Sequence, residues 1–234
     1  MLTPARRRGV EILDDPTVDA ALRVRSIADV TRSNRVLGGL RAALIEVRAA
    51  RANAAGPLTL LDVGSGLADI PQFACAEAQR AGYSLTTIAV DEAASLLAAA
   101  RERIAHAVCA NALFLPFEDA SVDVVMCSQL LHHFDDAGAL RLLAELNRVA
   151  RRAVIVSDLR RSWIAAAGFW LVSFPLGFHR ITRHDGVVSV LRGFTPSELA
   201  GLVRSATGAR VVVRRRLGFR ITVRWTPSAR VSAA

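Results

Sequence analysis

The sequence predicts an α/β fold with a doubly wound, mostly parallel sheet, and three observations carry that prediction. Short apolar runs alternate with helical stretches, one apolar run breaks into two glycines, and the chain closes with two strand-like runs around Leu217-Gly218. Strands that alternate with helices imply right-handed crossovers between parallel strands. The chain has 234 residues and is 52% hydrophobic, which is enough for a sizeable core.

The first 56 residues read as helical, because apolar residues recur at spacings of three and four with a break near Gly38-Gly39. We expect residues 1–56 to form a helical lid over a core at 57–234. In that core the runs LTLLDV, LTTIAV, VDVVMC and RAVIVS are typical of buried strands. Helices are predicted between them at roughly 69–81, 93–105 and 136–150.

The segment from Trp163 to Phe178 contains no charged residue and is flanked by arginines. A membrane-spanning helix needs about 20 residues, so this segment is short for one, and Pro175 interrupts it. We expect a substrate-cap insertion at 160–194, with contact to a membrane interface as the alternative. Thr195, Pro196 and Glu198 then form a capping box that predicts a helix, and an antiparallel hairpin ends the chain.

Charge and cysteine content limit the class of protein. The net charge of +9 comes from arginine alone, and the arginines are dispersed, so we read most of them as solvated surface charge. Three separated cysteines without a CxxC pair predict neither a disulfide framework nor a metal site. The N-terminal ARRRG is followed by VEILDDPTVD and not by an apolar stretch, so we expect a cytoplasmic protein, with the periphery of the inner membrane as a second location.

The run TLLDVGSGLADI predicts a ligand site at the carboxyl end of the first strand. Its glycines allow a tight turn, but Asp69 in the first helical turn and Asp62 before the glycines would repel a pyrophosphate. Asp91, at the end of the next strand, is placed to accept the hydroxyls of a ribose. The ligand therefore has a ribose, no phosphate and a tolerance for carboxylates, which fits S-adenosylmethionine.

Residues 58–160 resemble the class I S-adenosylmethionine-dependent methyltransferases, particularly the ubiquinone/menaquinone branch. The pieces that carry the resemblance are LLDVGSGLAD, VDEA, CANALFLPFEDASVDVVMCSQLLHHF and AVIVSDL. The resemblance implies a Rossmann-like seven-stranded sheet, S-adenosylmethionine as cofactor and S-adenosylhomocysteine as product.

The same resemblance implies where the cofactor lies. Gly64 to Gly66 would follow its methionine portion, Asp91 its ribose and Asn111-Ala112 its adenine. Two positions depart from the family: Ala68 replaces the usual third glycine, and Asn111 replaces an aspartate, although an Asn carbonyl still accepts a hydrogen bond. The predicted cofactor-binding set is Asp62, Gly64, Ser65, Gly66, Asp69, Asp91, Glu92, Asn111, Ala112, Ser128 and Gln129.

Methyl transfer needs alignment of the two reactants, and a base if the acceptor is a weak nucleophile. The candidate bases are His132, His133, His179, His184 and Asp185; we place His184 first, because RHDG pairs it with an acid, and His133 second. The predicted acceptor is small and hydrophobic, such as a phenol or quinone precursor, methylated on oxygen or carbon. The predicted acceptor-binding residues are Arg32, Asn34, Trp163, Trp170, Phe174 and Phe178.

Three other functions compete with this one. A nucleic-acid methyltransferase is disfavoured because SQLLHH stands where an Asn/Asp-Pro-Pro-aromatic motif is expected and no concentrated basic stripe is present, so we expect no nucleic-acid partner. A dehydrogenase is disfavoured by Asp69 and the missing third glycine. A non-catalytic protein of the same fold, which binds cofactor, lipid or protein, stays open because of Asn111 and Ala68.

Overall fold

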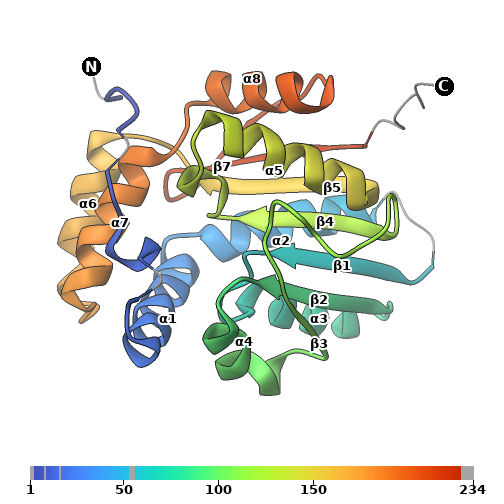
Figure 1. Cartoon of the computed structure of the whole chain (residues 1–234), viewed down its shortest axis with the longest axis horizontal. Coiled ribbons are helices and arrows are strands. Elements are labelled where there is room, and N and C mark those ends of the chain that lie inside the picture. The colour runs from blue at the N-terminus through green and yellow to red at the C-terminus, as the bar shows by residue number, and fades with distance from the viewer. Residues whose placement is uncertain (1–2, 8, 16, 53–55, 228–234) are drawn as a thin grey trace.

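The computed structural model describes residues 3–7, 9–15, 17–52 and 56–227, and it contains one seven-stranded sheet with helices on both faces (Figure 1). The strand order is β3-β2-β1-β4-β5-β7-β6. The strands are β1 (Leu58–Val63), β2 (Leu85–Asp91), β3 (His106–Cys109), β4 (Val122–Ser128), β5 (Ala150–Leu159), β6 (Arg214–Arg216) and β7 (Arg220–Trp225). The predicted doubly wound sheet with a C-terminal antiparallel hairpin is confirmed.

The helices largely follow the predicted positions. They are α1 (Ala20–Val36), α2 (Gly39–Arg51), α3 (Asp69–Arg80), α4 (Ala94–Ala100), α5 (Asp136–Val149), α6 (Trp163–Ser173), α7 (Arg180–Arg192) and α8 (Pro196–Thr207), with 3-10 turns η1 (Ile12–Asp14), η2 (Arg101–Arg103) and η3 (Leu131–His133). The capping box of α8 is present, with the Thr195 side chain accepting from the Glu198 N–H. The helix predicted at 93–105 stops at Ala100 and continues only as the 3-10 turn η2.

Parallel pairing of β1 with both β2 and β4 creates the point where the strand order reverses. Val63 at the end of β1 lies opposite Val90 of β2 and Cys127 of β4. In open α/β sheets the crevice at such a point, beyond the carboxyl ends of the strands, is where ligands bind. In Figure 1 the arrowheads of β1 and β4 point toward α1, α6 and α7.

Each face of the sheet has its own apolar core. On one face α5 and α8 bury leucines such as Leu143 and Leu199 against β1, β4, β5 and β7. On the other face α2 and α3 pack Leu44 and Ile70 against Leu60 and Ile155. Because α2 is a core helix of this layer, the described part of the predicted lid lines the crevice through Glu11, η1, Val18 and α1 and not through α2.

The C-terminal hairpin needs glycine at its turn and a buried acid at its base. Gly218 has a φ of 69°, and a Cβ there would lie 1.7 Å from the Leu37 carbonyl oxygen, so no other residue fits. Glu46 of α2 accepts hydrogen bonds from Thr222 and Arg216. These contacts attach the edge of the sheet to α2.

Candidate functional site

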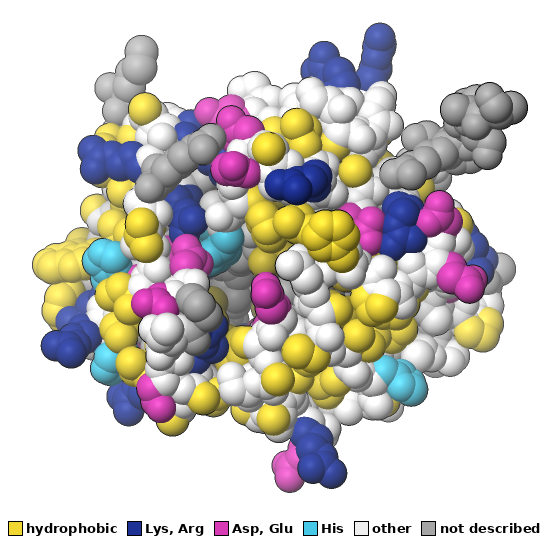
Figure 2. Space-filling model, viewed as in Figure 1, with side chains coloured by type: hydrophobic (Ala, Val, Ile, Leu, Met, Phe, Trp, Pro, Cys, Tyr) yellow, Lys and Arg dark blue, Asp and Glu magenta, His cyan; other side chains and the backbone are white. Residues whose placement is uncertain are grey.

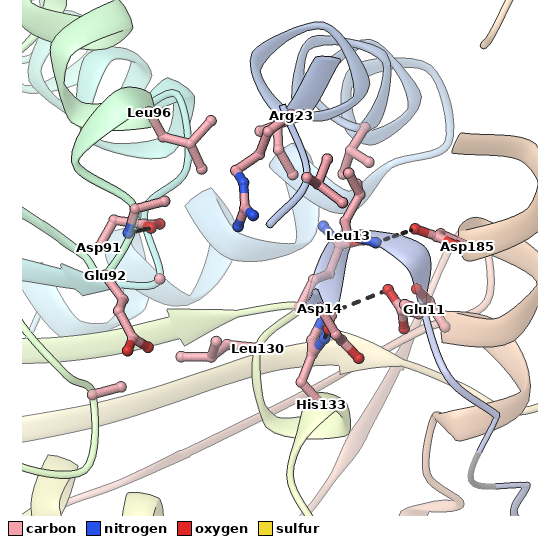
Figure 3. A pocket seen from close by; sticks show the side chains of 18 of the residues that line it. Glu11, Leu13, Asp14, Arg23, Asp91, Glu92, Leu96, Leu130, His133 and Asp185 are labelled. Atoms are coloured by element: carbon pink, nitrogen blue, oxygen red, sulfur yellow. Dashed lines mark hydrogen bonds and ion pairs between the residues drawn. The ribbon is translucent and has the colours of Figure 1, made fainter. Parts of the chain in front are cut away.

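A cavity of about 770 Å³ opens at the carboxyl ends of β1, β2 and β4, under η1, α1 and α7. Figure 3 shows Asp91 and Glu92 on one side of it, Glu11, Asp14 and His133 on the other, and Leu130 between them. The predicted cofactor residues that line the cavity are Gly64, Asp91, Glu92, Asn111, Ala112 and Gln129. Ser65, Gly66, Asp62, Asp69 and Ser128 are not part of the lining but adjoin the same loops.

The glycine loop is fixed against the end of β2. The N–H groups of Gly64 and Ser65 both donate to the Val90 carbonyl, at 2.8 and 2.9 Å, and the Gly66 N–H donates to Asp91 Oδ2 at 2.9 Å. Gly64 has a φ of 71°, and a Cβ there would lie 2.9 Å from Leu130, so the loop needs glycine for conformation and for space. The next helix begins after Ala68, whose φ of 55° is the left-handed conformation that a glycine would adopt without strain.

Two buried acids adjoin this loop and form no ion pair among the described residues, although the charges of Arg35 and Arg103 act on Asp69 from a distance. Asp62 accepts from Ser65 Oγ at 3.0 Å through one oxygen, while its Oδ1, like Asp69 Oδ2, has no hydrogen-bond partner among the described residues. Burial raises the pKa of Asp62 to about 8, and the charges of Asp69 and Asp91 add to the effect. Burial also raises the pKa of Asp69. An amine or sulfonium would relieve this cost, so the loop is suited to a cationic ligand.

Asp91 and Asn111 already hold backbone groups. Asp91 Oδ1 accepts from the Ala93 N–H at 2.9 Å, and Asn111 Oδ1 accepts from the Leu113 N–H at 2.8 Å. Each oxygen keeps a second acceptor position, because carboxylate and amide oxygens have two lone pairs. Both side chains are thereby oriented at the cavity wall before any ligand binds.

The loop after β4 is tied to α1 through a buried polar network. Gln129 Nε2 donates to Asn34 Oδ1 at 2.7 Å, and Arg220 donates to Gln129 Oε1 at 2.6 Å and to Asn34 at 3.1 Å. Burial lowers the pKa of Arg220 to about 10. Asn34 is thus a structural residue beside the cavity, and Arg32 also lies outside the lining, where it donates to the Leu176 carbonyl and Asp29.

The far end of the cavity holds a buried histidine fixed by an acid. His132 follows β4 and Asp158 lies near the end of β5, and their Nδ1 and Oδ1 atoms are 2.7 Å apart. Burial opposes ionisation of Asp158, but its contact with His132 lowers the pKa of that carboxyl nonetheless. His132 Nε2 is buried, has no hydrogen-bond partner in the described part of the chain and belongs to a side chain that lines the cavity. This is the arrangement of a base that is oriented by a carboxylate.

His133 lies next to His132, in an ion-paired cluster with the N-terminal segment. His133 Nδ1 is 2.8 Å from Asp14 Oδ1, and Arg192 contacts Asp14 at 2.7 Å and Glu11 at 3.1 Å. Burial works against a charge on His133, yet the hydrogen bond to Asp14 and the charge of Glu11 raise its pKa. The pKa of Asp14 falls to about 2, because its bonds to His133 and Arg192 outweigh its partial burial.

The same cluster has the geometry of a metal site, which the sequence did not predict. One ligand atom each from Glu11, His132 and His133 lies within 4.8 Å of the others, and both histidine Nε2 atoms are 3.9 Å from a Glu11 oxygen. Arg192, however, already pairs with Glu11 Oε1, the oxygen that faces His132. The guanidinium of Arg192 thus occupies one of the positions around Glu11 that a metal ion would need. We therefore assign the cluster to proton transfer and not to metal binding.

His184, the first predicted base, does not line the cavity. Residues 180–192 of the predicted insertion form helix α7, and the His184 side chain is 52% exposed. It does contact Asp185, at 2.8 Å, but the Asp185 oxygens face the N–H groups of Ile12 and Leu13, at 2.9 and 3.0 Å. In RHDG, therefore, the aspartate holds the η1 turn that carries Asp14, and no geometry supports the histidine as a base.

The aromatic residues predicted to contact the acceptor lie elsewhere. Trp163, Trp170 and Phe174 are 41%, 49% and 47% exposed, on the outer side of α6, and Phe178 is buried beneath Arg32. None of the four lines the cavity. The apolar lining includes instead Leu13, Val18, Ile27, Val30, Leu96, Leu113, Leu130 and Phe134.

Glu11 and Asp14 are the site residues that sequence reasoning missed. Both belong to the segment EILDD, which precedes the helical pattern and carries no catalytic motif. Their only signal was a short acidic run in an otherwise basic chain. They reach the site because Asp185 and Arg192, about 170 to 180 residues later, hold the segment in place.

Comparison with known proteins gives the class. A family model described as a methyltransferase domain matches residues 61–156, from β1 to β5. No curated protein matches the chain.

Solved structures of methyltransferases share the fold at low identity. Human N-acetylserotonin methyltransferase in complex with S-adenosylmethionine matches with a TM-score of 0.64 and 12% identity, over 90% of this chain and 57% of that chain. Magnesium protoporphyrin IX methyltransferase from Synechocystis PCC 6803, with bound S-adenosylhomocysteine, matches with a TM-score of 0.56 and 14% identity, over 85% of this chain and 87% of that chain. A candidate O-methyltransferase from Nostoc punctiforme PCC 73102 matches with a TM-score of 0.57 and 19% identity, over 80% of this chain but only 56% of that chain.

Residues 61–156 are therefore a methyltransferase domain, and the fold around them is that of the class I enzymes. The domain match supports the predicted class, an S-adenosylmethionine-dependent methyltransferase, and solved structures of this fold hold S-adenosylmethionine or S-adenosylhomocysteine. The ubiquinone/menaquinone branch stays a prediction.

Proposed function

We propose that this enzyme methylates a hydroxyl of a small, largely apolar acceptor such as a phenol or hydroquinone. One observation supports the proposal above the others: a single cavity joins the glycine loop with Asp91 to the histidine end with His132. The cofactor fits the first end, where two buried acids without a cationic contact adjoin the loop. The acceptor would then occupy the apolar middle and the histidine end.

Each end has a distinct task in this proposal. When bound, the cofactor supplies a methyl group activated on a sulfonium. Asp91, Asn111 and the glycine loop orient it, while Leu130 and its apolar neighbours exclude water and hold the acceptor in line. His132 Nε2 takes the hydroxyl proton, and Asp158 stabilises the resulting imidazolium through Nδ1.

His133 and Glu11 contribute to the net charge of the side chains around His132 Nε2. With Asp14 and Arg192 they form a nearly balanced set of acids and bases beside His132. A phenol bound there would meet His132 Nε2 beside four side chains whose charges nearly cancel. Apolar side chains between the two ends favour a hydrophobic acceptor over a nucleic acid or a polar metabolite.

Two measurements test the proposal. Titration calorimetry should give tighter binding of S-adenosylhomocysteine than of NAD, and a label-bearing methyl donor should transfer label to simple phenols or hydroquinones in preference to tRNA or DNA. Tighter NAD binding would refute the cofactor assignment. Transfer to nucleic acid alone, with intact cofactor binding, would refute only the acceptor class.

A further inference from the structure

Helix α6 carries an apolar surface that faces solvent. Its outward side chains Trp163, Ile164, Trp170 and Leu171, together with its C-cap residue Phe174, are 41–60% exposed. Their positions follow the spacing i, i+1, i+7, i+8 and i+11, which is one face of a helix. The opposite face, with Ala165 and Ala166, packs in the core cluster that α7 contributes to. We call the five exposed residues the α6 face.

This amount of clustered exposure requires an explanation. Single exposed apolar residues are ordinary, whereas a contiguous apolar patch marks an interaction site. The α6 face includes two tryptophans and a phenylalanine, and Trp170 and Phe174 stack edge to face with ring centroids 4.8 Å apart. Figure 2 shows hydrophobic side chains with arginines next to them at the left edge of the molecule, where Figure 1 has α6 and α7.

Arginines surround the α6 face. The Arg7 guanidinium lies 4.9 Å from the Trp163 ring, the Arg183 guanidinium lies 4.2 Å from the Phe174 ring, and Arg180 is exposed at the start of α7. No acidic residue occurs between Arg161 and Arg183. The first acid beyond them, Asp185, is buried with its oxygens on η1. The rim of the patch is thus cationic.

This combination selects one kind of partner. Tryptophan and phenylalanine favour the boundary between headgroups and acyl chains, and arginine keeps its charge in the headgroup layer. A second copy of the same face would oppose arginine with arginine, which disfavours a symmetric dimer through it. Within the described ranges no helix is long and apolar enough to cross a membrane, so α6 would lie along the surface.

We propose that the α6 face docks the protein on an anionic membrane surface, with Arg7, Arg180 and Arg183 against the lipid headgroups. The contact is made by apolar insertion together with charge. Thr182 and Asp185 of α7 line the cavity, so docking would bring the cavity close to the bilayer. The docking itself does not depend on which acceptor is methylated.

Vesicle co-sedimentation tests the proposal. The wild-type protein should bind vesicles of phosphatidylcholine and phosphatidylglycerol in equal parts, and should bind pure phosphatidylcholine at least about tenfold more weakly. Because a chain with a charge of +9 would bind acidic vesicles without any apolar contact, the decisive variant leaves the charge unchanged. Trp170→Ser/Leu171→Ser should lower partitioning at least about tenfold.

Controls separate the α6 face from general stickiness. Val212→Ser removes an apolar side chain that is 73% exposed outside α6 and α7 and should leave partitioning unchanged. Arg7→Glu/Arg180→Glu should weaken binding to acidic vesicles and reduce its salt dependence. Circular dichroism and thermal melting confirm that each variant is folded.

Tryptophan fluorescence provides an independent readout, since Trp225 is buried and Trp163 and Trp170 are exposed. Brominated phospholipids should quench the emission of bound protein. Equal partitioning of the wild type and the Trp170→Ser/Leu171→Ser variant, or binding without quenching, would overturn the proposal. So would a wild-type dimer in solution that the same variant abolishes, because the face would then belong to a second copy.

Discussion

The two ends of the cavity are both rich in acids, yet they handle negative charge in opposite ways. At the glycine loop, Asp62 and Asp69 are buried and form no ion pair in the described structure. At the histidine end, Glu11, Asp14 and Asp158 each contact a histidine or an arginine. The first end therefore lacks a cation that a ligand can supply, whereas the second is neutralised by the protein itself.

Under the proposed function, this difference would divide the two tasks of a methyltransferase between the two ends. Burial without a cationic partner raises the pKa of an acid, and binding of a cation then stabilises its charged form. An acid that is already paired instead orients its partner, as Asp158 does for His132. Predictions that alter one end and leave the other intact test the division directly.

The largest effect is expected at the histidine end. His132→Ala should lower kcat by roughly 10²–10⁴-fold, because the proton acceptor is lost, and should leave S-adenosylhomocysteine affinity nearly unchanged. His184→Ala, which changes a histidine outside the cavity, should turn over close to the wild-type rate. Steady-state kinetics with an active phenol distinguish the two. The reverse ranking would restore His184 as the base and refute the assignment of His132.

At the glycine end the expected effect is on binding. Asp91→Ala removes a charged acceptor at the cavity wall and two bonds to backbone N–H groups, so S-adenosylhomocysteine affinity should fall at least about tenfold. Glu102→Ala removes an exposed acid on η2 and serves as the matched control for lost charge. Calorimetry measures both. Unchanged affinity in a folded Asp91→Ala variant would mean that Asp91 does not hold the cofactor.

Much of the glycine end could be predicted from the sequence, because its residues follow one another along the chain. Asp62, Gly64 and Gly66 lie within five residues, and Asp91 ends the strand paired beside them. A local sequence pattern is enough to predict the position of such residues, and the order of strands and helices is enough to predict the type of sheet. The replacement of the expected third glycine by Ala68 could also be seen in the sequence, and the structure has Ala68 in the left-handed conformation that glycine favours.

The histidine end could not be predicted, because contacts between distant segments build it. Glu11 meets His132 only when α7 holds the N-terminal segment, and Asp158 reaches His132 from the neighbouring strand. Adjacent residues also misled the prediction: His184 and Asp185 do touch, but a helical backbone leaves the histidine in solvent and directs the acid to η1. Similarly, the aromatic content of α6 indicated a pocket, whereas helical periodicity puts those rings outside.

Stability should respond in opposite directions at the two ends. Asp14 has its pKa lowered from 3.8 to about 2, so it contributes stability above pH 4 that is lost as the pH falls toward 2. The raised pKa of His133 makes its contribution complete below pH 6.5 and lost as the pH rises through the folded value. Asp14→Asn should thus cost about 1 kcal/mol, after allowance for solvent screening, with the largest loss between pH 4 and 6.5.

Asp62→Asn, in contrast, should raise the free energy of unfolding of the ligand-free protein at high pH. With the pKa raised from 3.8 to about 8, the folded state retains a proton that the unfolded chain loses, so this residue lowers the free energy of unfolding as the pH rises from about 4 to 8. The variant should therefore be more stable than the wild type at pH 8, by on the order of 1 kcal/mol or more. Urea unfolding across this pH range compares the two variants, and a destabilised Asp62→Asn protein would contradict the assignment.

The smallest effect is expected from metal removal. Arg192 already neutralises Glu11 in the cluster with His132 and His133, so treatment with EDTA followed by dialysis should leave kcat unchanged. Zinc added to the dialysed enzyme should not activate it. A loss of activity that zinc restores would show that the cluster is a catalytic metal site and that its histidines are ligands.

The most direct test of the central claim, that the glycine end binds a cation with acids left unpaired, is a count of protons released on cofactor binding. Calorimetric titration of S-adenosylhomocysteine at pH 7, in buffers of different ionisation enthalpy, measures it. Burial raises the pKa of Asp62 to about 8, and an ammonium group bound at the adjoining loop would favour its ionised form, so we predict release of up to one proton, and clearly less from Asp62→Asn. Binding without proton release, or equal release from the wild type and the variant, would contradict the account.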